Sequence, residues 1–299
     1  MKNLLKWTGI VLAGVVGLVV VLGLAVYLLS EQRGNKTYEV SVTSFDIPTD
    51  AASIVEGERI ASIRACSDCH GADYGGGVLL EDPMLGNLYG PNLTTGEGSV
   101  TADYTPEDWA RAVRHGVGTN GEALLVMPAT DYARMSDEDL GRVIAFLQSA
   151  PPVDRTMPES KIGPLGRVLT VANQLPAYAA EKIDHTAPAI ISIEPEVSVE
   201  FGGYVATTCT GCHQPDFAGG PLPGAEPGSP PAANLTPSGH LGDWTYEGFA
   251  TTLRTGVTPE NKVLDPSVMP WPIAERMTDV EMEALWLYLQ SLPPALAEK

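Results

Sequence analysis

The sequence predicts a mainly α protein, with one N-terminal transmembrane helix followed by two tandem all-α domains of the same kind. Three observations indicate this fold: a long uncharged segment near the N-terminus, an internal repeat, and capped, amphipathic helical segments in both copies of the repeat. No segment of any length alternates polar and apolar residues as a strand would. The expected parts are an anchor (1–30), a stalk (31–52), domain 1 (53–152), an inter-domain connection (153–198) and domain 2 (199–299).

The anchor is predicted from the run between Trp7 and Leu29, which carries no charged residue. As a helix these 23 residues reach about 35 Å, and the hydrocarbon core of a membrane is about 30 Å thick. The alternative is a cleaved signal peptide, whose apolar region is shorter and ends in small residues. Here the run ends in Val26-Tyr27-Leu28-Leu29, so an uncleaved anchor is favoured.

The chain is strongly acidic, with a formal net charge of −19. Residues 1–36 contain four basic residues and one acidic residue, a net +3, so the rest of the chain carries −22. This charge excludes nucleic acid as a partner, because phosphate binding needs clustered Lys and Arg. It is compatible with a basic protein partner, or with a role in solubility alone.

The four cysteines all belong to one kind of motif. Residues 66–70 read C-S-D-C-H and residues 209–213 read C-T-G-C-H. C-x-x-C-H is the attachment signature of c-type haem, in which two thiols bond the porphyrin and the histidine becomes an axial iron ligand. We therefore expect two covalent haem c groups per chain, held by the cysteines Cys66, Cys69, Cys209 and Cys212 and ligated by His70 and His213.

Other uses of paired cysteines explain the sequence less well. A structural zinc site usually brings two cysteine pairs close together, whereas these pairs are 143 residues apart. A redox dithiol or a disulfide would account for the cysteines but not for the histidine that follows each pair.

The repeat extends well beyond the haem motifs. Asn92-Leu93-Thr94 and Asn234-Leu235-Thr236 correspond, and a middle helix follows each of them. Thr105 and Thr245 are the expected N-caps of these helices, and Gly116 and Gly256 their ends. The last helix of each copy has apolar residues at i, i+3, i+4 and i+7: Leu140, Val143, Ile144 and Leu147, then Met282, Leu285, Trp286 and Leu289.

The repeat also selects candidates for the second iron ligand. Met127 and Met269 occupy corresponding positions, each is followed by proline, and a methionine sulfur opposite histidine is a common haem ligand. Met135 and Met277 also correspond, but they directly precede helix N-caps, where an apolar residue packs on the first turn. His115 has no histidine counterpart in the second copy and is the fallback ligand for domain 1.

Two further features were open to interpretation. Arg114 and Arg254 lie just before the glycines that end the middle helices, and they suit either a haem-propionate or carboxylate partner or a snorkelling position at the helix end. In the connection we expect one helix around Leu165 to Ala180 and an ordered path across domain 1.

Over residues 54–152 and 199–294 the sequence resembles the cytochrome c subunits of membrane-bound alcohol and gluconate dehydrogenases. The shared features are Asn-Leu-Thr, an aromatic-led helix ending in Arg-x-Gly, Met-Pro, and Leu-Gln-Ser-x-Pro-Pro. The resemblance implies two cytochrome c-like all-α haem domains, with His70 and Met127 on one iron and His213 and Met269 on the other. That family commonly has three haem units and another kind of anchor.

The resemblance to c-type cytochromes also implies a location. Haem is attached to them on the outer side of an energy-coupling membrane, so we expect a cytoplasmic N-terminus and periplasmic haem domains. The expected function is single-electron transfer between a redox donor and an acceptor, such as a basic cytochrome or a membrane oxidoreductase complex, without catalysis of its own. The alternative is a dihaem cytochrome c peroxidase, which would need one iron with an open or opening site.

Overall fold

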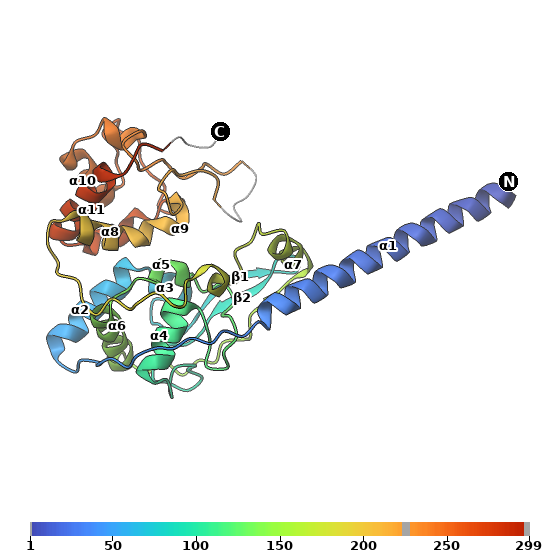
Figure 1. Ribbon diagram of the computed structural model, residues 1–299, viewed down its shortest axis with the longest axis horizontal. Helices are drawn as coiled ribbons and strands as arrows, with labels where there is room; N and C mark the ends of the chain where they lie inside the picture. Colours follow the sequence, from blue (N-terminus) through green and yellow to red (C-terminus); the bar gives the residue numbers. More distant parts are fainter. Residues whose placement is uncertain (1, 223–227, 296–299) are drawn as a thin grey trace.

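The structure is a computed structural model that describes residues 2–222 and 228–295 (Figure 1). Met1 of the expected anchor and residues 223–227 and 296–299 of the expected domain 2 lie outside the described residues. The fold is mostly helical, as predicted, with one long N-terminal helix beside two helical domains (Figure 1).

The elements follow the repeat. The anchor and domain 1 contain α1 (Lys2–Gly34), α2 (Ala51–Ile63), α3 (Cys66–His70), β1 (Gly77–Asp82), β2 (Gly86–Gly90), α4 (Pro106–His115), α5 (Ala129–Tyr132) and α6 (Asp137–Ser149). The connection contains β3 (Lys161–Ile162), α7 (Pro164–Val171) and η1 (Ala179–Lys182). Domain 2 contains α8 (Val199–Ala206), η2 (Thr207–Cys209), α9 (Thr210–His213), η3 (His240–Gly242), α10 (Tyr246–Thr255), η4 (Trp271–Arg276) and α11 (Asp279–Ser291).

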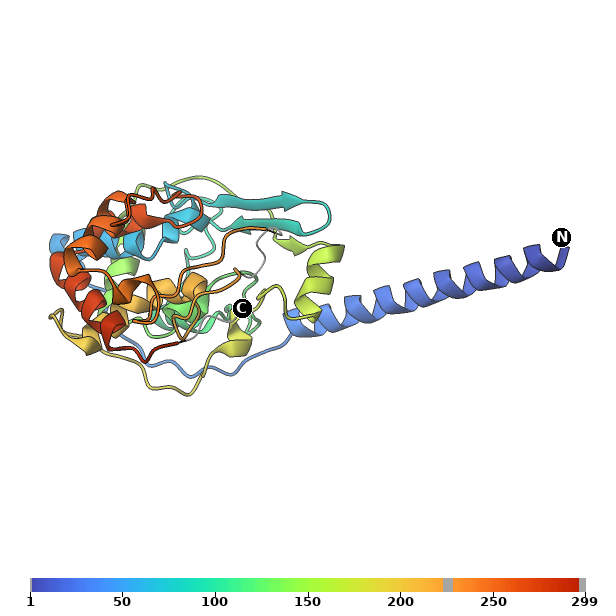
Figure 2. The same cartoon turned by 90° about the horizontal axis from the view of Figure 1, so that it is seen from above.

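Helix α1 is long and apolar enough to cross a membrane, with a mean hydropathy of 2.8 in its apolar window. It continues to Gly34, beyond the expected end of the anchor, and its last turn is fastened to the connection (Figure 2). Arg33 Nε donates to Glu181 at 2.9 Å, and Arg167 pairs with Glu31 at 2.7 Å. The helix is therefore held against the connection at a defined place.

The predicted helix ends are present because the capping signals are local. Thr105 and Thr278 form capping boxes, and Gly116 and Gly256 end their helices with φ of 63° and 70°. In each domain the first and last helices cross at a glycine. A Cβ on Gly57 would lie 1.9 Å from the Arg142 carbonyl oxygen, and a Cβ at the corresponding α8–α11 crossing would meet the same obstruction.

The loop after the first haem motif differs from the prediction, because it contains an antiparallel hairpin of β1 and β2. The short strand β3 from the connection adds to its edge, in the order β1-β2-β3. The turn is closed by Asp82, whose carboxylate accepts from the amides of Met84 and Leu85. The strands are short, β1 and β2 both begin with glycine, and β2 is paired with β3 far along the chain, so no long alternating pattern marks them.

The connection crosses domain 1, as predicted, but its helical part is shorter than expected. The chain leaves α7 at Val171, and Asn173 adopts φ of 57°, so the expected helix does not continue to Ala180. Further on, the carbonyl of Ile190 accepts from the amide of Asp137 at 2.7 Å. The stalk also lies against domain 1, where Tyr38 donates its amide to Gly121 at 2.8 Å.

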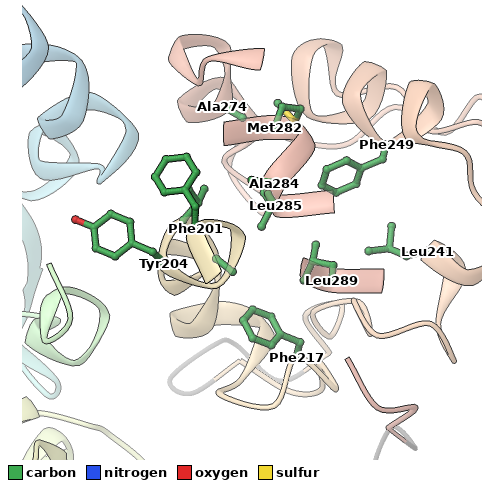
Figure 3. Close-up of a cluster of buried hydrophobic side chains, with 12 residues drawn as sticks. Phe201, Tyr204, Phe217, Leu241, Phe249, Ala274, Met282, Ala284, Leu285 and Leu289 are labelled. Carbon is green, nitrogen blue, oxygen red and sulfur yellow. The ribbon is translucent and has the colours of Figure 1, made fainter. Parts of the chain in front are cut away.

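Each domain has its own hydrophobic core. In domain 2 the aromatic residues Phe201, Phe217 and Phe249 gather around α11 (Figure 3). Tyr204 points from α8 toward domain 1 (Figure 3), where its hydroxyl donates to Asp139 at 2.6 Å. The two cores are thus separate but joined by polar contacts across a close interface.

Candidate haem sites

The two attachment motifs have the same local structure. The first occupies α3 and the second continues from η2 into α9, so the two cysteines of each motif lie about one helical turn apart. Burial raises the pKa of the Cys66 thiol to about 12 and that of the Cys209 thiol to about 11. Across residues 2–222 and 228–295 no group of three or more His, Cys, Asp or Glu could hold a metal ion, so the described chain offers no zinc cluster.

The histidine of each motif is oriented by a backbone carbonyl. Nδ1 of His70 donates to the oxygen of Pro91 at 2.9 Å, and Nδ1 of His213 donates to that of Ala233 at 2.8 Å. A carbonyl only accepts, so this contact assigns the proton to Nδ1 and leaves the Nε2 lone pair for a metal. Burial lowers the pKa of both imidazoles, which favours the neutral, ligating form.

The repeated Asn-Leu-Thr segment explains how these carbonyls are held in place. Asn92 accepts from the backbone and hydroxyl of Thr94 and donates from Nδ2 to the carbonyl of Val153 at 2.7 Å. Asn234 makes the corresponding bonds, with Ala295 as its acceptor at 2.9 Å. Each asparagine therefore fastens the loop that carries the histidine's acceptor to the chain leaving the last helix.

In domain 1 the predicted ligand pair lies in one cavity. His70 and Met127 both line a cavity of about 580 Å³, together with Trp109 and Met157. Nε1 of Trp109 is buried and has no hydrogen-bond partner in the described part of the chain. A neutral imidazole, a thioether and an unpartnered N–H donor suit haem c, whose propionates accept hydrogen bonds, although neither Cys66 nor Cys69 is among the lining residues.

The loop that carries Met127 is strained and supported from outside the domain. Val126, a β-branched residue, has φ of 62°, and its amide donates to the carbonyl of Ala177 in the connection at 2.7 Å. Met135 is instead buried in the core of domain 1 and does not line the cavity. The structure thus separates the two repeated methionines of this domain.

Domain 2 brings its predicted residues together less fully. Met269 and Cys209 line a cavity of about 440 Å³ between the two domains, but His213 is not among its lining residues. Met277 lines the same cavity, so the structure does not separate it from Met269 as it separates the corresponding pair in domain 1.

The other candidates have structural partners. His115 and His185 approach each other through their Nδ1 atoms at 3.1 Å, and neither lines a haem cavity. Arg114 pairs with Asp137 at 2.6 Å, and Arg254 in domain 2 reaches the corresponding first residue of α11. Both arginines therefore join the middle helix to the last helix through a carboxylate, which is one of the partners that the sequence left open.

Sequence reasoning missed several residues of these sites. Trp109 carries an indole N–H donor, whereas the side chain of its counterpart Phe249 has none. Met157 has no methionine counterpart in domain 2, so the repeat does not point to it. Residues that serve one domain alone leave no signal in a repeat.

Comparison with protein families agrees with this geometry. Domain 1 matches the family described as cytochrome c oxidase, cbb3-type, subunit III, over residues 52–147, and domain 2 matches cytochrome c over residues 203–293. The chain therefore contains two cytochrome c domains, the kind of domain that its two attachment motifs predicted. The chain is similar to the cytochrome subunits of fructose and alcohol dehydrogenases, in agreement with the resemblance of its sequence motifs.

Three relatives illustrate the similarity. The fructose dehydrogenase cytochrome subunit of Gluconobacter japonicus is 28% identical over 82% of this chain and 54% of its own length. The cytochrome c subunit of the quinone alcohol dehydrogenase of Gluconacetobacter polyoxogenes is 30% identical over 82% and 57%. A dihaem c-type cytochrome of Cereibacter sphaeroides is 28% identical over 68% and 73%. The chain spans about half the length of the two dehydrogenase subunits.

Proposed function

We propose that this protein is a membrane-anchored dihaem cytochrome that passes single electrons between redox partners on the periplasmic side of the membrane. His70 and Met127 would ligate the first iron, and His213 and Met269 the second. The observation that carries the proposal is the first cavity, where an oriented neutral imidazole and a methionine line the same space beside a haem attachment motif. The repeat extends the same assignment to domain 2.

Each haem c, when bound, supplies an iron that takes up and releases one electron. The protein's own residues would set how readily this happens. The carbonyls of Pro91 and Ala233 keep each imidazole in its ligating tautomer, and a methionine sulfur as the opposite ligand raises the potential. The largely apolar walls of the cavity exclude water from the iron.

The cellular setting is also part of the proposal. The long apolar helix α1 supports a single-pass anchor with a cytoplasmic N-terminus, followed by a region of charge −22. Relatives named as dehydrogenase cytochrome subunits support a membrane oxidoreductase complex as one partner, and the acidic charge suits a basic cytochrome as another. The chain would act as a carrier and not as an enzyme.

A dihaem peroxidase would need an open iron site, whereas methionine–proline loops repeat in both domains. The relatives named above are two dehydrogenase cytochrome subunits and a dihaem c-type cytochrome, and none of the three is named as a peroxidase, so they give the peroxidase alternative no support.

The test is a set of methionine variants. Intact protein should retain two haems per chain after denaturation, with no titratable thiol. Met127→Ala and Met269→Ala should each remove about half of the thioether-to-ferric-iron absorption band and open one iron to carbon monoxide. Met135→Ala is the matched control, because it should cost about 2–5 kcal/mol of stability and leave the band intact. An unchanged spectrum in Met127→Ala, or rapid peroxide turnover by the unmodified protein, would refute the assignment.

A further inference from the structure

The two haem attachment motifs meet at the interface between the domains, and one side chain joins them. Arg64 precedes Cys66 by two residues, at the end of α2. Its Nη1 donates to the hydroxyls of Thr207 and Thr208, both at 2.7 Å, and these threonines directly precede Cys209. One guanidinium thus lies beside the start of both motifs, although they are far apart in the sequence.

The framework around Arg64 comes from both domains. The hydroxyl of Tyr132 donates to the Arg64 carbonyl at 2.9 Å, and the guanidinium lies 5.2 Å above the ring of Tyr204. Asp131, next to Tyr132 in α5, accepts from Thr210 inside the second motif at 3.3 Å. The labelled helices α5 and α9 face each other across the domain boundary (Figure 1). The position of this side chain is therefore fixed from several sides.

The charge of Arg64 is buried and not neutralised by a direct ion pair. The residue is 4% exposed, and its Nε has no hydrogen-bond partner in the described ranges. The acidic groups that face it are Asp131 and Asp139, and neither forms a salt bridge with it within these ranges. Its positive charge also acts on the thiols of both Cys66 and Cys209, opposing the effect of their burial.

We propose that Arg64 is a positive charge shared by the two haem sites, which holds the attachment motifs together and raises the reduction potential of both haems. This inference rests on the proposed function, because it requires a haem at each motif. Reduction of a ferric iron takes one electron from the redox partner, lowers the charge of the site by one, and breaks no bond. A fixed positive charge nearby, screened little by water, favours that reduced state.

The sharing has a functional consequence. A charge beside only one haem would separate the two potentials and direct the electron to one site. A charge that lies beside both motifs raises both potentials together, so it leaves the electron equilibrium between the two sites unchanged. Arg64 would act as a positioning residue, through its field and its hydrogen bonds, without touching an iron.

The test is spectroelectrochemical titration of full-length dihaem protein in detergent. Arg64→Gln should lower the reduction equilibrium constant of both haems about tenfold, equivalent to about 59 mV for one electron. Arg64→Lys keeps the charge and should restore most of both potentials. Arg142→Gln is the matched control, because it removes the same formal charge from a more exposed side chain at the interface and should change either constant less than about twofold.

A second variant tests the tether without removing the charge. Thr207→Val with Thr208→Val removes both hydrogen bonds to domain 2, so the potential of the second haem alone should fall. Unchanged potentials in Arg64→Gln, a shift of one haem only, or no rescue by Arg64→Lys would overturn the inference. If the Arg64→Gln protein cannot be obtained in folded form, the double threonine variant is the test. An unchanged potential of the second haem in that variant would overturn the inference. A haem content below two in the unmodified protein would instead overturn the proposed function.

Discussion

The ion pair between Arg59 and Glu281 should stabilise the whole protein by joining its two domains. Arg59 belongs to α2 and Glu281 to α11, and the two make paired contacts of 2.7 and 2.9 Å. The Glu281 side chain is only 8% exposed and that of Arg59 21%. Removing one partner therefore leaves a largely buried charge without its counter-ion.

The expected magnitudes follow from this burial. Breaking a buried pair costs about 3–5 kcal/mol, but Arg59 retains Glu56 as a partner, so we expect about 2–3 kcal/mol for Glu281→Gln. Glutamine can still serve the capping box with Thr278, so the helix start is preserved. Arg59→Met should cost about 2–4 kcal/mol, because it leaves the buried carboxylate without a cation.

Urea denaturation of the two single variants and the double variant, followed by circular dichroism, measures the coupling. The double variant should lose about 1–3 kcal/mol less than the sum of the single losses. Arg142→Met, which removes an exposed pair with Glu138, is the control and should cost below about 1 kcal/mol. Additive losses at Arg59 and Glu281 would show that the pair does not join the domains energetically.

Three other outcomes are expected. Replacing residues 1–29 with a cleavable signal should release a soluble, red protein, because the contacts of Ser30 and Arg33 with the connection are kept. Retention in the membrane fraction would contradict the anchor. Electron transfer to a basic partner should slow as ionic strength rises, since the screening length falls to about 10 Å at 0.1 M. A rate that does not depend on salt concentration would favour a fixed complex. The pKa of His115 is lowered to about 4, mainly by burial and then by the charges of His185 and Arg114. Between about pH 6.5 and 4 the unfolded chain therefore binds more protons than the folded one. Stability should therefore fall as the pH drops through this range, and His115→Thr should remove about 1–2 kcal/mol of that loss, measured from urea midpoints at pH 7 and 5.

Much of the helical framework could be predicted because its determinants are local. The cap at Thr105 and the helix end at Gly116 depend on residues within one or two turns, and the structure has both. The haem motifs are likewise contiguous. The hairpin could not be predicted, since β2 pairs with β3 of the connection and its strands are too short for a clear alternation.

The contacts between the domains could also not be predicted from the sequence. Arg64 and Arg59 look like ordinary helix residues until residues more than 140 positions away are placed beside them. Their burial as charged groups is a property of the assembled interface. A local pattern can indicate that a helix forms, but not which distant carboxylate or hydroxyl will lie against it.

The repeat predicts two equal haem sites, yet the structure supports their methionine loops differently. In domain 1 the connection holds the loop, because Ala177 accepts from the amide next to Met127. In domain 2 the corresponding amide, that of Val268, donates instead to the carbonyl of Asp265 in the same loop at 3.0 Å, and Val263 and Val268 are exposed. Met269 lies instead in a cavity bounded by domain 1. Inter-domain contacts should therefore influence iron ligation in domain 2 more than in domain 1, although both sites derive from the same motif.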